Sequence, residues 1–194
     1  DIVLTHWHHD HVGGVPYVLR MLQRLRREVP QLPVPRVHKI PEPKTDPSLF
    51  ERVQSVSDDA YAHAPGATGL ARLMWPLHDQ DQIQVRDPDN AHLTSTLRVL
   101  YTPGHAADHA MLLLEEDHIL LTADNVLGKG STVFEDLVLY MYSLQRVLSL
   151  LQTCKPTPLG VSGTPTTGMA GENVLFPGHG PVIPKGKETL RRYM

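Results

Sequence analysis

The chain has 194 residues, 41% of them apolar, which is enough for one well-packed core and predicts a single domain over residues 1–194. The formal net charge is −3, and no run of five or more like charges occurs. This balance argues against affinity resting on a broad phosphate-binding surface, while a local basic groove stays open. Cys154 is the single cysteine, so no internal disulfide can form.

The first residues have the pattern of a strand from the interior of a domain. Residues 2–5 form an apolar strand, and the densest chemistry of the chain follows at once. We therefore expect a partial domain whose N-terminal strands are missing. No apolar stretch approaches the roughly 20 residues that span a bilayer, so no membrane partner is expected. An intracellular location, cytoplasmic or mitochondrial, is favoured.

The first half of the chain alternates strand and helix patterns. Residues 6–14 read as a polar loop, and apolar side chains at helical spacing predict an amphipathic helix over 15–29. A proline-rich stretch follows, with a short strand expected at 34–40. Residues 48–75 are ambiguous between a helix and a glycine-containing loop.

The second half predicts a strand at 97–101 and a hairpin from 111–114 and 119–122. Thr132 and Glu135 have the spacing of a capping box before a helix. Residues 153–173 look like a surface loop insertion, and 174–176 like a last strand. The alternation indicates a layered α/β fold, in which sites collect where strands end.

Four potential metal ligands lie within six residues: His6, His8, Asp10 and His11. Imidazole and carboxylate groups suit zinc, and also iron or manganese when more oxygen ligands are present. One ion cannot readily take all four from so short a loop. Four adjacent polar groups also gain nothing from burial unless something pairs them. The run therefore predicts two neighbouring metal sites.

Three further candidates follow strands downstream, namely His105, Asp124 and His179. The glycines beside both histidines permit tight turns. His6, His8 and His105 could serve one ion, and Asp10, His11 and His179 the other, with Asp124 bridging them. Taken singly, each of the three downstream residues reads more simply as a structural residue. The remaining histidines are interpreted as non-ligands: His9, His38, His63, His78, His92 and His118.

His109 stays open. It lies four residues after His105, and the sequence leaves a supporting donor or a substrate contact about as plausible as a surface histidine.

The run His6-x-His8-x-Asp10-His11 with Gly13-Gly14 resembles the signature of the metallo-β-lactamase superfamily, which includes glyoxalase II. That resemblance implies an αββα sandwich with the metals at one edge, and it supports His105, Asp124 and His179 as ligands. It also implies strands before the histidine run that carry a supporting aspartate, and these are absent here. Ala106 and Ala107 stand where polar residues are common in the family.

A narrower resemblance to the lactamase-β-like-protein-2 group rests on four segments: residues 5–11, 122–128, 132–137 and 176–183. Animal members of that group are single-strand-specific endoribonucleases of mitochondria. Its fungal relatives include thioesterases that release polyketides from an acyl carrier protein.

Three functions follow as hypotheses. The preferred one is a binuclear hydrolase, with two Zn²⁺ or other divalent ions and a metal-bound hydroxide, acting on a thioester or ester such as a carrier-bound acyl or polyketide. Asp10 would orient or deprotonate the nucleophile. The alternatives are a single-strand-specific endoribonuclease, with RNA as its partner, and a degenerate domain that binds metal or a partner without turnover.

Overall fold

The computed structural model describes residues 1–54, 56, 74–86, 90, 94–153 and 173–194. The chain divides into two compact units, Asp1–Leu77 and His78–Met194. Each unit contains one β-sheet, three-stranded in the first and five-stranded in the second. The predicted insertion at 153–173 lies almost wholly outside the described residues, as do His63 and His92.

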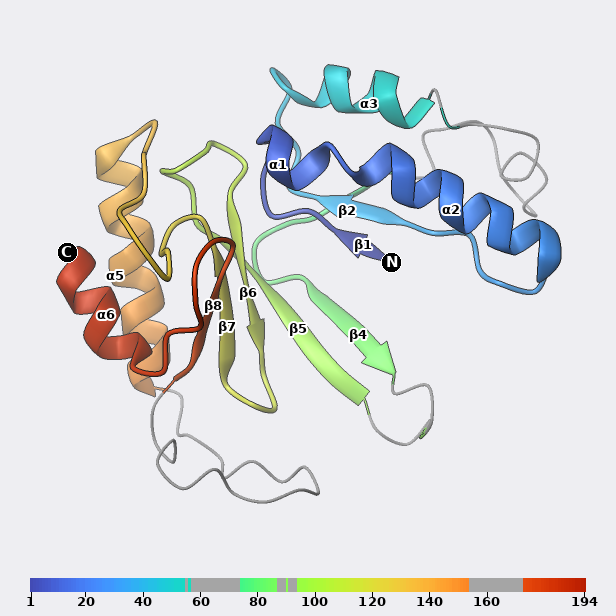
Figure 1. Cartoon of the computed structure of the whole chain (residues 1–194). Coiled ribbons are helices and arrows are strands. Elements are labelled where there is room, and N and C mark those ends of the chain that lie inside the picture. Colours follow the sequence, from blue (N-terminus) through green and yellow to red (C-terminus); the bar gives the residue numbers. More distant parts are fainter. Residues whose placement is uncertain (55, 57–73, 87–89, 91–93, 154–172) are drawn as a thin grey trace. The chain divides into compact units, whose positions relative to one another are not determined.

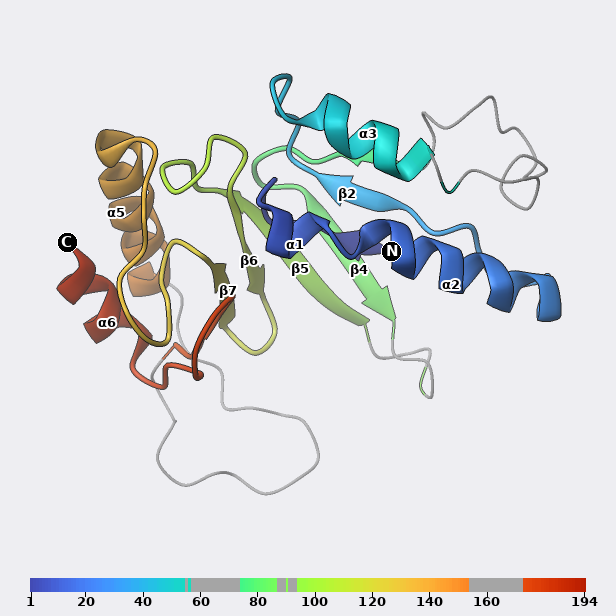
Figure 2. The same ribbon diagram turned by 45° about the horizontal axis from the view of Figure 1, so that its top comes forward.

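The first unit is a small parallel sheet with helices that cover it. Strands β1 (Ile2–Val3), β2 (Val37–Lys39) and β3 (Met74–Pro76) run in that order. The helices are α1 (His9–Val12), α2 (Val15–Glu28) and α3 (Asp46–Gln54). Helices α2 and α3 lie side by side (Figure 2), and both contribute to one apolar core with β2.

Helix α2 confirms the helix expected from sequence spacing. Pro16 lies in its first turn, where a missing N–H leaves no hydrogen bond unmade. Val15 and Leu19 are buried against Val37 of β2 and Leu49 of α3. Each such side chain contributes about 1.5–3 kcal/mol when it leaves water. The position of α1, and with it the histidine run, is fixed through Val12, which belongs to the same core.

The second unit is built on a five-stranded sheet (Figure 1). Its strands are β4 (Gln82–Arg86), β5 (Thr94–Tyr101), β6 (Ala110–Leu114), β7 (Ile119–Ala123) and β8 (Leu175–Pro177), in that order. The first four strands pair antiparallel, and β8 joins β7 in parallel. The hairpin of β6 and β7 confirms the one predicted.

Helices α5 (Leu137–Thr153) and α6 (Gly186–Tyr193) pack on this sheet. The apolar face predicted for α5 is buried through Leu144, Leu148 and Leu151, which meet Leu120 of β7 and Leu190 of α6. The polar loops at the ends of β5, β7 and β8 are therefore held by a continuous core. None of the helices in the described part of the chain is long and apolar enough to cross a membrane.

Three local predictions were wrong or incomplete. The histidine loop contains a helical turn, α1, rather than an irregular loop. Strands β3 and β4 were missed, although Ile83 and Val85 alternate with polar neighbours as a half-buried strand should. The capping box at Thr132 does not form, because α5 starts at Leu137 and Asp136 accepts a hydrogen bond from the Leu139 N–H. Thr132 has another role, described below.

Asp79 ties the end of β5 to α5. Its carboxylate accepts hydrogen bonds from the Tyr101 N–H at 2.8 Å and from the Arg146 guanidinium at 2.6 Å. Burial alone would raise the pKa of this carboxyl, but these donors outweigh it and hold the pKa below its ordinary value. The folded state therefore favours the ionised form.

Replacing Asp79 with asparagine should lower the free energy of unfolding by about 0.5–1 kcal/mol at pH 7, since the group is partly exposed and screened. The stabilisation is complete above the unfolded-state pKa of about 3.9 and is lost as the pH falls through the lower folded-state pKa. Urea denaturation of both proteins at pH 7 and pH 3 measures this. An Asp117→Asn control removes the same charge from the β6–β7 turn; a deficit of equal size at both pH values would contradict the account.

Candidate metal centre

The first unit gathers four predicted ligands within one short segment. Strand β1 leads into Thr5 and His6, and the helical turn α1 then brings Asp10 and His11 back towards them. The rings of His6 and His11 lie 4.1 Å apart between centroids. His11 Nε2 lies 3.7 Å from an Asp10 carboxylate oxygen. The structure thus brings His6, Asp10 and His11 close together within this unit.

Hydrogen bonds orient the imidazoles of this cluster. The Thr5 hydroxyl contacts Nδ1 of His6 at 3.0 Å and Nδ1 of His11 at 3.4 Å. When each Nδ1–H donates to Thr5, the lone pair of each ring is at Nε2. His6 Nε2 lies 3.0 Å from His8 Nδ1. Two ring nitrogens therefore converge on one point, and His6 is fully buried there.

The second unit gathers the other three candidates at adjacent strand ends. His105 follows β5, Asp124 follows β7, and His179 follows β8. The Gly178 N–H donates to the Ala123 carbonyl, and the Gly128 N–H donates to the His179 carbonyl. These bonds hold the β7 and β8 loops together.

The backbone around these ligands takes unusual conformations. Gly104 and Gly180 have φ angles of 138° and 86°, which explains the glycines beside His105 and His179. Ala123, directly before Asp124, has a φ of 44°, and the register of β7 with β8 shifts at this residue. Left-handed conformations at non-glycine residues cluster at functional sites. Here one of them aims the Asp124 side chain.

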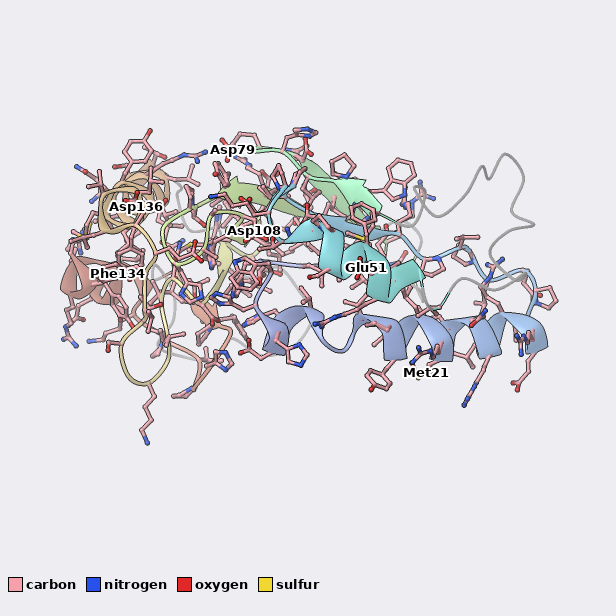
Figure 3. The ribbon with its side chains drawn as sticks, turned by 90° about the horizontal axis from the view of Figure 1, so that it is seen from above. Met21, Glu51, Asp79, Asp108, Phe134 and Asp136 are labelled. Atoms are coloured by element: carbon pink, nitrogen blue, oxygen red, sulfur yellow. The ribbon has the colours of Figure 1, made fainter. Side chains whose placement is uncertain are left out.

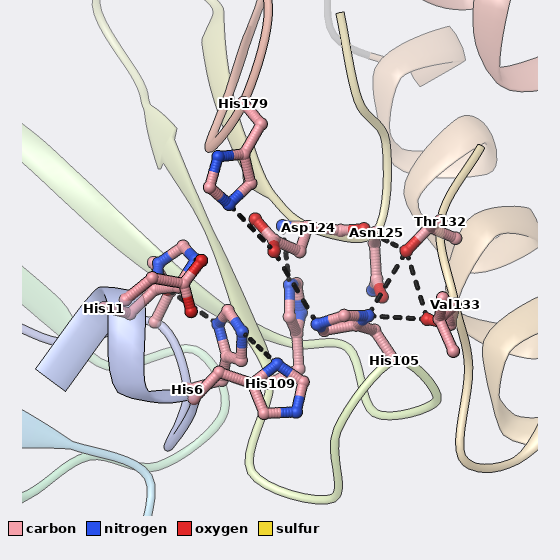
Figure 4. A network of polar contacts seen from close by, with 12 residues as sticks. His6, His11, His105, His109, Asp124, Asn125, Thr132, Val133 and His179 are labelled. Carbon is pink, nitrogen blue, oxygen red and sulfur yellow. Dashed lines mark hydrogen bonds and ion pairs between the residues drawn. The ribbon is translucent and has the colours of Figure 1, made fainter. Parts of the chain in front are cut away.

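Asp124 lies between the two histidines (Figure 4). One of its carboxylate oxygens is 3.7 Å from His105 Nε2 and 3.4 Å from His179 Nε2. Both separations exceed the 2.7–2.9 Å or so of a charge-assisted hydrogen bond. His105 and Asp124 are nearly buried, while the side chain of His179 is 51% exposed. The three side chains present one oxygen and two nitrogens to a common space.

His105 is oriented by the segment before α5. Its Nδ1–H donates to the Val133 carbonyl at 2.6 Å, which leaves the lone pair on Nε2, the atom that faces Asp124. The Thr132 hydroxyl lies 3.2 Å from the same Nδ1 and donates to the Asp124 carbonyl. Such outer partners fix the tautomer of a metal-binding histidine. The spacing of Thr132 and Glu135 predicts a helix cap, but the Thr132 hydroxyl contacts His105 and Asp124 instead.

His109 is a supporting residue and not a surface histidine, because it is fully buried. The Asp124 N–H donates to His109 Nε2 at 3.3 Å, so this nitrogen is unprotonated and Nδ1–H donates to the Thr102 hydroxyl at 3.0 Å. Both ring nitrogens are engaged in these bonds, which excludes His109 as a ligand in this tautomer. It holds the backbone of Asp124 in place.

The donor sets fit divalent transition metals. Two nitrogens bound to one tetrahedral zinc ion lie roughly 3.3 Å apart, close to the 3.0 Å between His6 Nε2 and His8 Nδ1. In the second unit, an imidazole fixed as an Nε2 ligand stands beside a carboxylate. Imidazole with carboxylate suits zinc, iron and manganese alike. Some histidines were predicted not to bind metal. Those of them that the structure describes lie outside both clusters.

The family model of the metallo-β-lactamase superfamily matches residues 1–179, and the chain belongs to this superfamily. The match spans both units and every residue of both clusters. It also confirms the α/β fold class expected from the sequence.

Two curated relatives show what the chain is similar to. It is 31% identical over 193 residues to a "Beta-lactamase-like protein 2 homolog" of Caenorhabditis elegans, covering 100% of this chain and 46% of the relative. It is 29% identical over 191 residues to an "Atrochrysone carboxyl ACP thioesterase" of Aspergillus fumigatus, covering 98% and 41%. The chain thus spans less than half the length of these relatives.

A solved structure agrees with the fold. TTHA1623, crystallised in a di-iron-bound form, matches with a TM-score of 0.54 at 25% identity, over 96% of this chain and 73% of the other.

Proposed function

We propose that the chain binds two divalent metal ions and hydrolyses a thioester or ester, with a carrier-bound acyl or polyketide group as the preferred substrate. The proposed ligands are the two clusters described above, taken together: His6, His8, Asp10, His11, His105, Asp124 and His179. The proposal is supported by the family match across both clusters and by the Val133 carbonyl, which can only accept and therefore fixes the tautomer of His105.

Each of the two ions would take ligands from both clusters. His6, His8 and His105 would hold one ion, Asp10, His11 and His179 the other, and Asp124 both. Zinc is the preferred metal, and iron fits the same donors. Two bound dications would supply an activated water near neutral pH and offset negative charge developing on the substrate. Asp10, whose side chain is 58% exposed, would accept the proton that this water loses.

The observation that favours an acyl substrate is an exposed apolar segment next to His105. Val133, whose carbonyl fixes the His105 ring, is 78% exposed, and Phe134 and Leu137 are 44% and 52% exposed. Phe134 stacks on Tyr140 at 5.6 Å, so its ring is held rather than free to rotate. Apolar side chains exposed next to polar ligands suit a substrate with an acyl body and a reactive carbonyl.

A chain-length series tests this proposal. Zinc-loaded protein is incubated with N-acetylcysteamine thioesters of acetate, hexanoate and benzoate, and the released thiol is measured. We expect metal-dependent hydrolysis with higher kcat/KM for the apolar acyl groups than for acetate. If protein with full metal content hydrolyses none of the three thioesters, the proposal is overturned. That result would favour a domain that binds metal or a partner without turnover.

A second candidate, cleavage of single-stranded RNA, is favoured by α2. This helix carries Arg20, Arg24, Arg26 and Arg27 but one acidic residue, Glu28. Tyr17 is 71% exposed beneath the Arg20 guanidinium, at 5.7 Å. Met21 lies on the side of α2 away from α3 (Figure 3) and is also exposed. Cationic and aromatic side chains together suit a single strand.

The same metal-loaded protein distinguishes the two candidates when it is given a labelled single-stranded RNA. Metal-dependent RNA cleavage with inert thioesters would replace the acyl proposal by the nuclease. Thioester hydrolysis with intact RNA would reject the nuclease.

A further inference from the structure

A pocket in the first unit lies beside the histidine run but is lined by residues that the proposed metal site does not use. Its walls come from Trp7, from His9 and Val12 of α1, and from Thr45, Leu49 and Arg52 at the start of α3 and along it. Positions 45, 49 and 52 share one face of a helix, because they are separated by four and three residues. We propose that this pocket binds a small organic anion, a carboxylate or phosphate on an apolar body.

At the base of the pocket, the charges of Lys39 and Asp46 neutralise each other. Lys39 Nζ is buried and donates to an Asp46 carboxylate oxygen at 2.6 Å and to the Ile40 carbonyl at 2.9 Å. The other Asp46 oxygen accepts from the Glu42 N–H at 2.7 Å. Both residues line the pocket and offset each other's charge. The net charge contributed by the lining is therefore that of Arg52.

Arg52, His9 and Thr45 bring hydrogen-bond donors to the pocket. The Arg52 guanidinium lies 3.1 Å from His9 Nδ1, and a guanidinium can only donate. His9 Nδ1 is therefore the acceptor, and the proton of the neutral ring is on Nε2, a second donor. The Thr45 hydroxyl oxygen is buried and has no hydrogen-bond partner among the described residues. An isolated buried hydroxyl is unfavourable, and an anion oxygen would satisfy it.

The remaining walls are apolar. Trp7 is about one-third exposed with its ring against His8 at 4.7 Å, and Val12 and Leu49 are buried. A cation with donors on one side and an aromatic and aliphatic surface on the other matches an anionic head group on an apolar body. This arrangement also gives a role to His9, the one histidine of the run that the metal assignment leaves out.

Trp7 provides the readout. The chain has two tryptophans, so a Trp75→Phe background makes Trp7 the sole one. The protein is used metal-free, which keeps anions from binding to metal and separates this test from that of the proposed function. Phenylacetate, phenyl phosphate and inorganic phosphate are titrated in turn while Trp7 fluorescence is recorded. We expect saturable changes with both aromatic anions, and at least about ten-fold weaker binding of inorganic phosphate.

Two substitutions in the lining should weaken binding of the aromatic anions. Arg52→Gln removes the charge and should raise Kd at least about ten-fold, and Thr45→Val removes one donor and should raise it about three-fold. Arg86→Gln, an exposed arginine on β4, is the matched control and should leave Kd unchanged. Lack of a saturable signal, equal affinity for inorganic phosphate, or equal weakening by Arg86→Gln would each overturn the proposal. Thr45→Val keeps the test valid should Arg52→Gln fold poorly.

Discussion

Replacing Asp124 with asparagine should reduce the bound metal to about one ion per chain and lower kcat/KM for thioesters at least about 100-fold. One Asp124 carboxylate oxygen faces both His105 Nε2 and His179 Nε2, at 3.7 and 3.4 Å. The amide keeps the shape of the carboxylate but removes its charge, and a bridging site depends on that charge. Metal analysis after gel filtration and thiol release measure the two effects.

Two controls test whether these effects are specific to Asp124 and whether the variant is folded. Asp117→Asn, at the other end of β7, removes the same charge outside the cluster and should leave metal content and kcat/KM unchanged. The thermal midpoint of metal-free Asp124→Asn should stay near that of the metal-free parent, because the Asp124 backbone still bonds His109 and Thr132. Full metal content and full activity in the variant would refute the role assigned to Asp124.

Replacing Gly104 with alanine should destabilise the second unit by roughly 3–5 kcal/mol, enough to unfold many domains. A Cβ at this position would lie 2.3 Å from Tyr140 Cα and 2.5 Å from Tyr140 N, and backbone atoms cannot move aside as a side-chain tip can. The φ of 138° adds strain for any residue with a Cβ. Glu135 and Asp136 both donate their N–H groups to the Gly104 carbonyl, so a shift here would also disturb the start of α5.

Gly130→Ala is the matched control for Gly104→Ala. Gly130 also has a positive φ, 85°, but nothing lies within 4 Å of its added Cβ. Gly130→Ala should lower the free energy of unfolding by about 1–2 kcal/mol, which is the strain of a left-handed conformation alone. Urea denaturation compares the two variants. Equal losses would show that close packing on Tyr140 is not what requires glycine at 104.

Periodic patterns predicted the elements whose packing is local or regular. Helix α2 has apolar residues on one face at helical spacing, and β6 and β7 are short apolar runs on either side of a polar turn. Strand β3 could not be read in this way, since Met74–Pro76 is three residues long and contains a proline at an end. Its place in the sheet depends on pairing with β2, which lies more than thirty residues earlier.

The candidate ligands stand out in the sequence because histidines and an aspartate occur there in a spacing that is typical of metal sites. Their supporting residues were not. Thr132 has the local signature of a cap, yet its hydroxyl serves His105 and Asp124, which precede it by 27 and 8 residues. The role of His109 could not be decided from the sequence for the same reason, because its partners Thr102 and Asp124 follow β5 and β7. Tertiary contacts decide such roles, and no spacing encodes them.

The metal content of the intact chain tests the central proposal most directly. Elemental analysis of protein loaded with zinc and passed through gel filtration should give about two ions per chain. His8→Ala removes a ligand of one proposed set and His11→Ala a ligand of the other. Each variant should therefore retain about one ion per chain. One ion or none in the unmodified chain, or two ions retained by both variants, would contradict the proposal that these seven residues form a binuclear centre.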